Sequence, residues 1–311
     1  MEFEHIPVLR DECIEGLRII PDGIYVDGTL GGAGHASEIC KQLSLNGHFI
    51  GIDQDKNALE ASTIRLAHVK PKVSLVRSNF EEIENVLDHL DIEAIDGMLI
   101  DLGVSSHQLD EPLRGFSYMH DAPLDMRMNQ DNNYTAYHVV NELSEEEIFL
   151  IIRDYGEENW ARRIAQFIVA RRKDAPIRTT YELVDIIKGA IPHGARKDGP
   201  HPAKRTFQAI RIAVNRELEI IEPTIIHAAK KLKSGGRLCI ITFHSLEDRI
   251  VKNAFKKLQD PCVCPKNFPI CVCGNIQEMK IITRKPILPS DEEVERNPRS
   301  RSAKLRIIEK L

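Results

Sequence analysis

The feature that most constrains the fold of this chain is a glycine-rich turn near its start. Four glycines lie within seven positions in residues 27–35, DGTLGGAGH, directly after an apolar run at 24–26, and a helix-compatible stretch follows at 36–43. This order of strand, glycine turn and helix is typical of the ligand cradle in an open α/β sheet. Glycine lets the backbone approach a ligand closely, and the helix start offers unpaired N–H groups to a negatively charged ligand group.

A second apolar run, HFIGID at 48–53, ends in a carboxylate. It lies about 20 residues beyond the turn, where an acid can accept hydrogen bonds from a ribose. That spacing suits both NAD and S-adenosylmethionine (SAM). A dinucleotide fingerprint requires G-x-G-x-x-G, and Ser37 occupies the position of its third glycine. The acid before the glycines, Asp27, suits a ligand with an ammonium group and no pyrophosphate, so the local chemistry favours SAM.

Strand-like runs at 73–77, 95–102 and 237–242 continue the pattern, and helical stretches at 56–67 and 81–90 separate the early strands. Such alternation predicts right-handed βαβ units and a parallel sheet, with candidate last strands at 280–283 and 303–308. Ligands bind at the carboxyl ends of parallel strands. We therefore expect one crevice to gather the groups at these ends, namely Asp27, Asp53, the segment 78–80 and Asp101.

Between residues 108 and 215 no convincing strand pattern occurs. The segment contains capping boxes that begin at Ser144 and Thr179, and amphipathic patterns predict helices at 158–172 and 203–221. We predict an α/β domain formed by residues 1–107 and 216–311, with an inserted all-helical domain at 108–215. In the second part of the α/β domain, residues 216–311, an S-x-x-D pattern predicts that Ser245 caps a helix.

The composition is that of a globular protein: 42% of the 311 residues are hydrophobic and 29% are charged. An acidic start without an apolar stretch leads us to expect no signal peptide. No run reaches the roughly 20 apolar residues of a membrane helix. An odd number of cysteines, seven, argues against a disulfide framework. We expect a cytoplasmic protein.

Charge is segregated along the chain despite the net charge of −5. Residues 160–216 contain 13 Lys and Arg against 4 Asp and Glu, which favours a polyanion-binding surface over solvated helix faces. For phosphate contacts we select Arg162, Arg163, Arg171, Arg172, Lys204, Arg205 and Arg211.

Four cysteines form two C-x-C pairs, Cys262 with Cys264 and Cys271 with Cys273. Paired thiolates can hold tetrahedral zinc, although C-x-C is tighter than the usual spacing and no histidine accompanies it. Reduced cysteines at the ends of a hairpin explain the pattern equally well, so the metal content stays open.

Seven motifs together resemble the RsmH family, also called MraW. They are HIPVL at 5–9, DGTLGGAGH at 27–35, DLGVSS at 101–106, DMRM at 125–128, AKRTFQAIR at 203–211, FHSLEDR at 243–249 and NPRSRSAK at 297–304. The resemblance implies a Rossmann-like SAM-dependent methyltransferase with an inserted helical substrate domain. The implied substrate is the exocyclic N4 amine of a decoding-site cytosine in 16S rRNA, and the implied partner is the small ribosomal subunit.

By position, the resemblance places the SAM contacts on Ala33, Gly34, His35, Asp53, Phe80, Asp101 and Gln108. For catalysis we expect Asp101, or a nearby backbone carbonyl, to accept from the target amine, with Ser105, Ser106 and His244 on the substrate side. Many amino-methyltransferases carry an Asp/Asn-Pro-Pro-aromatic motif after the fourth strand. DLGV replaces it here, so no group is assigned to stack on the base.

Several alternatives remain at this point. The basic insertion disfavours a small-molecule methyltransferase, but a DNA N4-cytosine methyltransferase is compatible with the sequence. The incomplete G-x-G-x-x-G motif disfavours an NAD-dependent oxidoreductase. The full set of acids at strand ends disfavours a non-catalytic RNA-binding protein with a vestigial fold. The oligomeric state, and the choice between naked rRNA and an assembled subunit, are not predicted.

Overall fold

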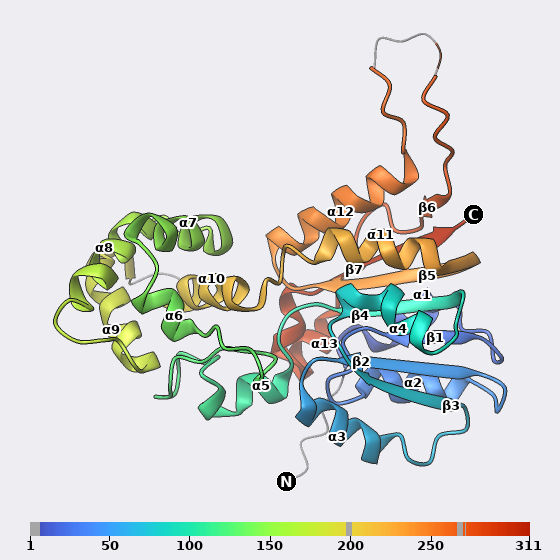
Figure 1. Cartoon of the computed structure of the whole chain (residues 1–311), viewed down its shortest axis with the longest axis horizontal. Helices are drawn as coiled ribbons and strands as arrows, with labels where there is room; N and C mark the ends of the chain where they lie inside the picture. Colours follow the sequence, from blue (N-terminus) through green and yellow to red (C-terminus); the bar gives the residue numbers. More distant parts are fainter. Residues whose placement is uncertain (1–6, 197–200, 266–269, 271) are drawn as a thin grey trace. The chain divides into compact units, whose positions relative to one another are not determined.

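A computed structural model describes residues 7–196, 201–265, 270 and 272–311 (Figure 1). The chain forms two compact units. Residues 1–103 and 218–311 make the sheet unit, and residues 104–217 make the helical unit. The sequence prediction placed these divisions after residues 107 and 215.

The sheet unit contains, within the described residues, one seven-stranded sheet in the order β3-β2-β1-β4-β5-β7-β6. Its strands are β1 (Ile24–Asp27), β2 (His48–Asp53), β3 (Lys72–Arg77), β4 (Ile95–Asp101), β5 (Leu232–Thr242), β6 (Met279–Ile281) and β7 (Lys304–Lys310).

Strands β1 to β5 are parallel, and β7 runs antiparallel to both β5 and β6. The central strands are apolar and almost wholly buried, as parallel strands covered on both faces must be. In register, Val26 lies between Ile50 of β2 and Met98 of β4. The predicted Rossmann-like α/β sheet is therefore confirmed.

Helices cover both faces of this sheet (Figure 1). The core on one face involves α4 (Ile83–His89), α11 (Ile221–Lys231) and α12 (Ser245–Gln259), and the core on the other involves α1 (Arg10–Leu17) and α2 (Gly34–Gln42). The remaining helical elements of the unit are α3 (Lys56–Arg65), α13 (Asp291–Arg296), η1 (Phe80–Glu82) and η4 (Pro298–Ser302).

The helical unit has its own hydrophobic core, to which Ile152, Ile164, Ile187 and Phe207 contribute. Its elements are α5 (Ser106–Asp110), η2 (Pro112–Arg114), α6 (Ala136–Asn141), α7 (Glu145–Gly156), α8 (Ala161–Arg171), α9 (Thr180–Ala190), η3 (His193–Arg196) and α10 (Lys204–Asn215). The capping boxes predicted at Ser144 and Thr179 are present at the starts of α7 and α9.

Two expectations about helices are wrong. The predicted helix 203–221 is two helices, because Arg216 adopts a left-handed conformation (φ 54°) that ends α10, and α11 begins at Ile221. The cap of α12 is His244, and Ser245 is the first helical residue. Across the described part of the chain, no helix is long and apolar enough to span a bilayer.

Candidate active site

Three carboxyl groups lie at the carboxyl ends of three adjacent strands of the sheet unit. Asp53 ends β2, Asp27 ends β1 and Asp101 ends β4, and β1 pairs with both neighbours. The structure therefore brings these sequence-predicted acids to one edge of the sheet, which is the edge where open α/β folds bind ligands.

A short hydrogen-bonded network joins the ends of β1 and β4. The backbone N–H of Asp101 donates to Thr29 Oγ1 (2.6 Å), and that hydroxyl lies 3.4 Å from Asp27 Oδ1, to which it donates. The backbone N–H of Thr29 also donates to Asp27 Oδ1 (3.0 Å). Asp27 thus organises the glycine turn through Thr29, and Thr29 holds the backbone of Asp101.

Asp53 is fixed by the glycine turn and by the start of the next helix. The N–H of Gly31 donates to Asp53 Oδ2 (2.8 Å), and the N–H of Asp55 donates to Asp53 Oδ1 (2.8 Å). Asp55 in turn caps α3 by accepting from Asn57 N. The carboxylate is therefore held in one orientation by backbone groups on both sides.

Burial makes all three acids reluctant to ionise. Desolvation raises the pKa of Asp27 to about 7, and the bonds from Thr29 limit the rise. Desolvation raises the pKa of Asp53 to about 6 against the opposing bonds from Asp55 and Gly31. The pKa of Asp101 is raised well above its ordinary value by desolvation and by the nearby charges of Asp27 and Glu247. Perturbed carboxyl groups gathered at one site are typical of functional centres.

Asp101 is the acid with an unused acceptor. The Asp101 side chain is 26% exposed. Its Oδ1 atom, however, is buried and has no hydrogen-bond partner among the described residues. Its Oδ2 atom lies 4.0 Å from His35 Nδ1. The other ring nitrogen of His35, Nε2, is 2.8 Å from the carbonyl oxygen of Val8. A buried acceptor left without a donor costs about 1–3 kcal/mol, a cost that a bound donor would remove.

The glycine turn forms a backbone cradle at the start of α2. Gly31 and Ala33 both have positive φ, 48° and 57°, and no side chain caps the helix at Ala33. Among the described residues, a Cβ added at Gly32 would meet no atom within 4 Å, whereas one added at Gly34 would lie 3.1 Å from Pro7. Gly32 therefore faces open space beside the uncapped helix start, as a ligand cradle requires.

Phe80 and Gln108 occupy different surroundings. Phe80 is partly buried, begins η1 and packs against the core near Gly28, where an added Cβ would lie 3.2 Å from Phe80 Cβ. Gln108 is buried in the helical unit, and its Oε1 accepts from Ser105 N in the capping box of α5. Ser105 is the cap of that helix. Ser106 is its first residue, and its side chain lies outside the described part of the chain.

His244 lies at the end of β5 together with a buried glutamate. Glu247 is 1% exposed, and its Oε2 accepts from Phe243 N (2.7 Å) and His244 N (3.2 Å). His244 Nδ1 accepts from Glu247 N (3.4 Å). His244 Nε2 lies 3.0 Å from Glu247 Oε1, but His244 Nε2 has no hydrogen-bond partner among the described residues. The cap function expected of Ser245 thus belongs to His244, because Glu247 reaches back to its N–H.

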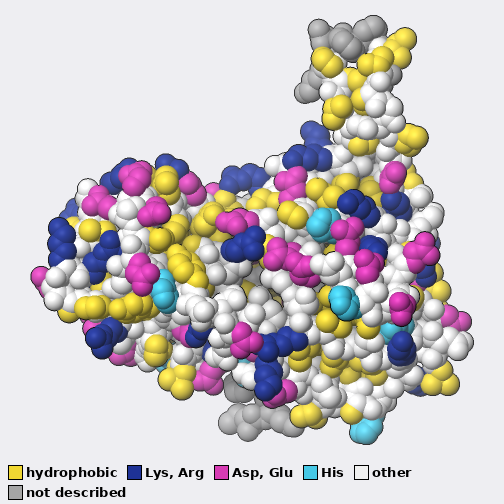
Figure 2. Space-filling model, viewed as in Figure 1, with side chains coloured by type: hydrophobic (Ala, Val, Ile, Leu, Met, Phe, Trp, Pro, Cys, Tyr) yellow, Lys and Arg dark blue, Asp and Glu magenta, His cyan; other side chains and the backbone are white. Residues whose placement is uncertain are grey.

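The seven basic residues selected for phosphate contacts all lie in the helical unit, and their surroundings differ. Arg162 pairs with Glu146 and lies over the ring of Phe149. Arg211 is half-buried and forms a bidentate pair with Glu217 (2.9 and 2.8 Å). On the visible surface of this unit, Lys and Arg alternate with Asp and Glu (Figure 2).

Three of the remaining arginines donate to carbonyl oxygens of the unit. Arg172 donates to Val140 O (2.8 Å), Arg205 to Glu157 O (3.1 Å) and Arg171 to Ala175 O (3.5 Å). Arg163 and Lys204 are exposed, with Arg163 over the ring of Phe167. Five of the seven selected side chains are exposed, namely Arg162, Arg163, Arg171, Lys204 and Arg205, and Arg172 and Arg211 are partly buried.

Two residues of the site were missed by sequence reasoning. Thr29 is the link between β1 and β4, and Glu247 sets the turn after β5. Glu247 had a signal, because it stands three residues after His244 in the position of a capping-box acid. Thr29 had none, because its partner Asp101 is distant in the sequence.

The edge of the sheet fits SAM, the cofactor predicted from the glycine turn. The Asp53 carboxyl is held by two backbone N–H groups, the backbone at 31–34 lies beside a helix start, and Asp101 Oδ1 has no partner among the described residues. When bound, SAM supplies a methyl group on a positively charged sulfur.

Comparisons with known proteins identify the family of this chain. A family model described as the MraW methylase family matches residues 2–311. The chain is 62% identical over 311 residues to "Ribosomal RNA small subunit methyltransferase H" of Clostridioides difficile, with 100% of both chains covered. It is 58% identical over 313 residues to the protein of the same name from Ruminiclostridium cellulolyticum, again with 100% of both covered. The chain therefore belongs to the MraW methylase family of SAM-dependent methyltransferases, as its motifs predicted.

Proposed function

We propose that this protein transfers the methyl group of SAM to the exocyclic N4 amine of a cytosine in the 16S rRNA of the small ribosomal subunit. The name of the two relatives supports the rRNA substrate. The acceptor for the amine is inferred from the Asp101 carboxyl at the end of β4: its side chain is 26% exposed, and its Oδ1 has no hydrogen-bond partner among the described residues. An exocyclic amine brings the N–H donor that this atom lacks.

Asp101 accounts for the chemistry of the proposed reaction. The lone pair of a cytosine amine is delocalised into the ring, so the amine is a poor nucleophile. A hydrogen bond from its N–H to an acceptor localises the lone pair on nitrogen. Asp101 accepts that hydrogen bond and aligns the nitrogen. Bound SAM would supply the methyl group to the aligned nitrogen, and the proton released from nitrogen passes to Asp101 or through it to water. Its raised pKa suits it to take a proton, and alignment supplies much of the acceleration.

The remaining predicted contacts hold the cofactor in this proposal. Asp53 accepts from the ribose hydroxyls, because both of its oxygens are already oriented by backbone N–H groups. Ala33, Gly34 and His35 form the cradle, and Phe80 lies beside the adenine. Gln108 is proposed as a further SAM contact, and Ser105, Ser106 and His244 are proposed as substrate contacts.

The helical unit, in this proposal, is the RNA-recognition domain of a cytoplasmic enzyme. Its exposed cations Arg162, Arg163, Arg171, Lys204 and Arg205 contact phosphates, and Arg172 and Arg211 support them. A cytosine in folded RNA is stacked, so it must be extruded before its amine can reach a reacting methyl group. Unstacking costs a few kcal/mol, and the phosphate contacts offset this cost.

The test is methyl transfer from labelled SAM to three substrates: small subunits lacking the modification, naked 16S rRNA and cytosine-containing DNA. Nuclease digestion and mass spectrometry of the nucleosides identify the methylated atom. We expect N4-methylcytidine at one site of the rRNA, supplied either as subunit or as naked RNA. Label on DNA alone, or on another atom of the base, would contradict the proposal.

A further inference from the structure

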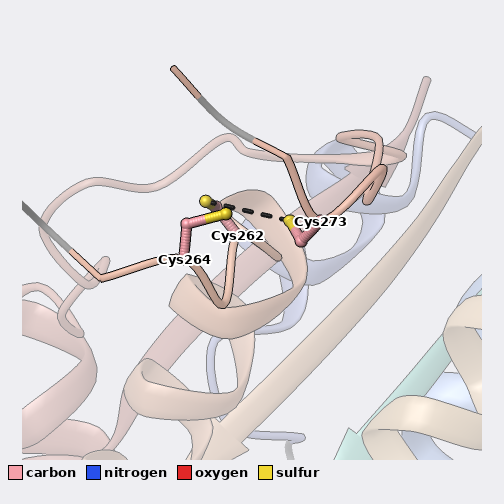
Figure 3. Close-up of side chains that lie close together, drawn as sticks. All are labelled: Cys262, Cys264 and Cys273. Carbon is pink, nitrogen blue, oxygen red and sulfur yellow. Dashed lines mark hydrogen bonds between the residues drawn. The ribbon is translucent and has the colours of Figure 1, made fainter. Parts of the chain in front are cut away.

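An extended excursion, described at residues 261–265, 270 and 272–278, leaves the sheet unit between α12 and β6 (Figure 1). Its described residues contain no helix or strand. Cys262 and Cys264 lie on the outgoing arm and Cys273 lies on the returning arm, and their sulfur atoms meet between the two arms (Figure 3). Neither the methyl-transfer chemistry nor the cofactor cradle uses these residues.

The three sulfur atoms have the separations of ligands to one metal ion. All lie within 4.8 Å of one another, and the Sγ atoms of Cys262 and Cys273 are 3.9 Å apart. Two thiolates on a tetrahedral zinc, with Zn–S bonds of about 2.3 Å, are separated by about 3.8 Å. A disulfide would require about 2.05 Å. The spacing thus matches the edge of a tetrahedral site.

The backbone around the cysteines supports thiolate ligands. The N–H of Val272 donates to Cys264 Sγ (3.3 Å), and such a bond stabilises negative charge on sulfur. Asn275 Nδ2 donates to Pro261 O (2.8 Å) and so ties the two arms together beside the cluster. Gly274 has a φ of 71°, which turns the chain directly after Cys273.

The described residues of the excursion contribute no side chain to a hydrophobic core. Val263, Ile270, Val272 and Ile276 are between 72% and 79% exposed, and the outer part shows hydrophobic side chains at its surface (Figure 2). Small elements that cannot bury a core are commonly stabilised by a disulfide or a metal.

We propose that Cys262, Cys264 and Cys273 bind a structural zinc ion that clamps the two arms of the excursion. The soft thiolate donors select zinc over magnesium or calcium. The remaining coordination position is left to another donor, and Cys271 lies outside the described residues. The ion joins the outgoing arm, at Cys262 and Cys264, to the returning arm, at Cys273.

The first experiment measures metal in the full-length, untagged protein, purified under reducing conditions. We expect about one zinc per chain, removable by chelator and restored by added zinc. Replacement by Co²⁺ should give the thiolate-to-metal and d–d absorption bands of a tetrahedral site. The double variant C262S/C264S should lose both the zinc and the spectrum. Cys40→Ala, a substitution at a buried cysteine outside the cluster, should retain them.

A second readout separates loss of metal from loss of fold. Limited proteolysis should cut residues 261–278 rapidly in the chelated protein and in C262S/C264S, and slowly in the zinc form, while thermal unfolding of the rest changes little. A wild-type protein that takes up no zinc or cobalt when reduced overturns the proposal. So does a metal content that Cys40→Ala lowers as much as the double variant does.

Discussion

At the end of β1, Asp27 is 2% exposed and its pKa is raised to about 7, chiefly by desolvation. In the folded state it keeps its proton at pH values where the unfolded chain, with a pKa of about 4, has released it. The free energy of unfolding therefore falls as the pH rises from about 4 to about 7, and it stays lower above that range.

The substitution Asp27→Asn should remove this pH-dependent loss, because the amide oxygen can still accept from Thr29. Between about pH 5 and about pH 8, the free energy of unfolding of the variant should rise by on the order of 3 kcal/mol relative to that of the wild type. Urea unfolding at both pH values measures the difference. Glu15→Gln, a change at an exposed carboxyl on α1, should show no such gain. An equal pH dependence in Asp27→Asn and the wild type would refute the assignment.

Asp101 carries the proposed chemistry, so Asp101→Asn should lower kcat by about 10²–10⁴-fold with a smaller effect on SAM affinity. The ionised carboxyl is the proton acceptor, and its pKa is raised. Wild-type kcat should therefore increase with pH over a range above the ordinary Asp pKa, and the variant should lose this rise. Single-turnover rates across pH, with SAM binding by calorimetry, provide the measurement. A variant with unchanged kcat would remove Asp101 from the mechanism.

Thr29 should matter through its hydroxyl group. Thr29→Val keeps the shape but leaves the backbone N–H of Asp101 without its acceptor, which should cost about 1–3 kcal/mol of stability. Thr29→Ser keeps the hydroxyl and should lose less. Chemical denaturation of the three proteins distinguishes the hydrogen bond from side-chain packing, since equal losses in both variants would point to packing.

At the residue scale, the sequence identified side chains that end strands and missed those that link strands. Asp27, Asp53 and Asp101 each follow an apolar run, so their position at one sheet edge follows from strand periodicity alone. Thr29 contacts Asp101 across a separation of 72 residues, and no local pattern encodes such a contact. Serine is the stronger cap by propensity, so the sequence pattern points to Ser245. The cap is instead His244, because Glu247 Oε2 accepts from the backbone N–H of His244.

At the scale of elements, the capping box of α7 offers a test. Ser144 Oγ accepts from Glu147 N, and Glu147 Oε2 accepts from Ser144 N (2.8 Å). Ser144→Ala should destabilise the helical unit by about 1 kcal/mol. Ser245→Ala removes a serine from the first turn of α12 without removing its cap, so it should cost less. Denaturation midpoints of both variants measure the contrast, and a larger loss at Ser245 would contradict the cap assignment.

The strands and most helices were predictable because apolar periodicity reports which face is buried. The boundary between α10 and α11 was not predictable, because apolar residues at Val214, Leu218 and Ile221 continue a helical spacing across the break. The chain turns there through Arg216, and Glu217 pairs with Arg211 on the helix it has just left. The Arg211–Glu217 ion pair is a tertiary contact, and helix propensity alone does not predict it.

At the scale of the whole molecule, the proposed RNA contacts should make binding strongly dependent on salt. Charge reversal at Arg163 and Lys204, both exposed, should weaken rRNA binding. It should also flatten the slope of log affinity against log salt by roughly one unit for each phosphate that the variant no longer neutralises. Lys252→Glu, on α12 of the sheet unit, is the matched control and should change little. Filter binding across salt concentrations gives the slope. A double variant with the wild-type slope would place the RNA surface elsewhere.

The division of the sheet unit between two stretches of chain has a consequence for biosynthesis. β4 and β5 are paired neighbours in the finished sheet, but the whole helical unit is translated between them. While the ribosome makes that unit, β4 is a nascent edge strand with unpaired backbone groups beside a half-built core. Open edges of this kind favour aggregation. We therefore expect slow translation within residues 104–217 to lower the yield of native protein, and chaperones that cover exposed strands to raise it.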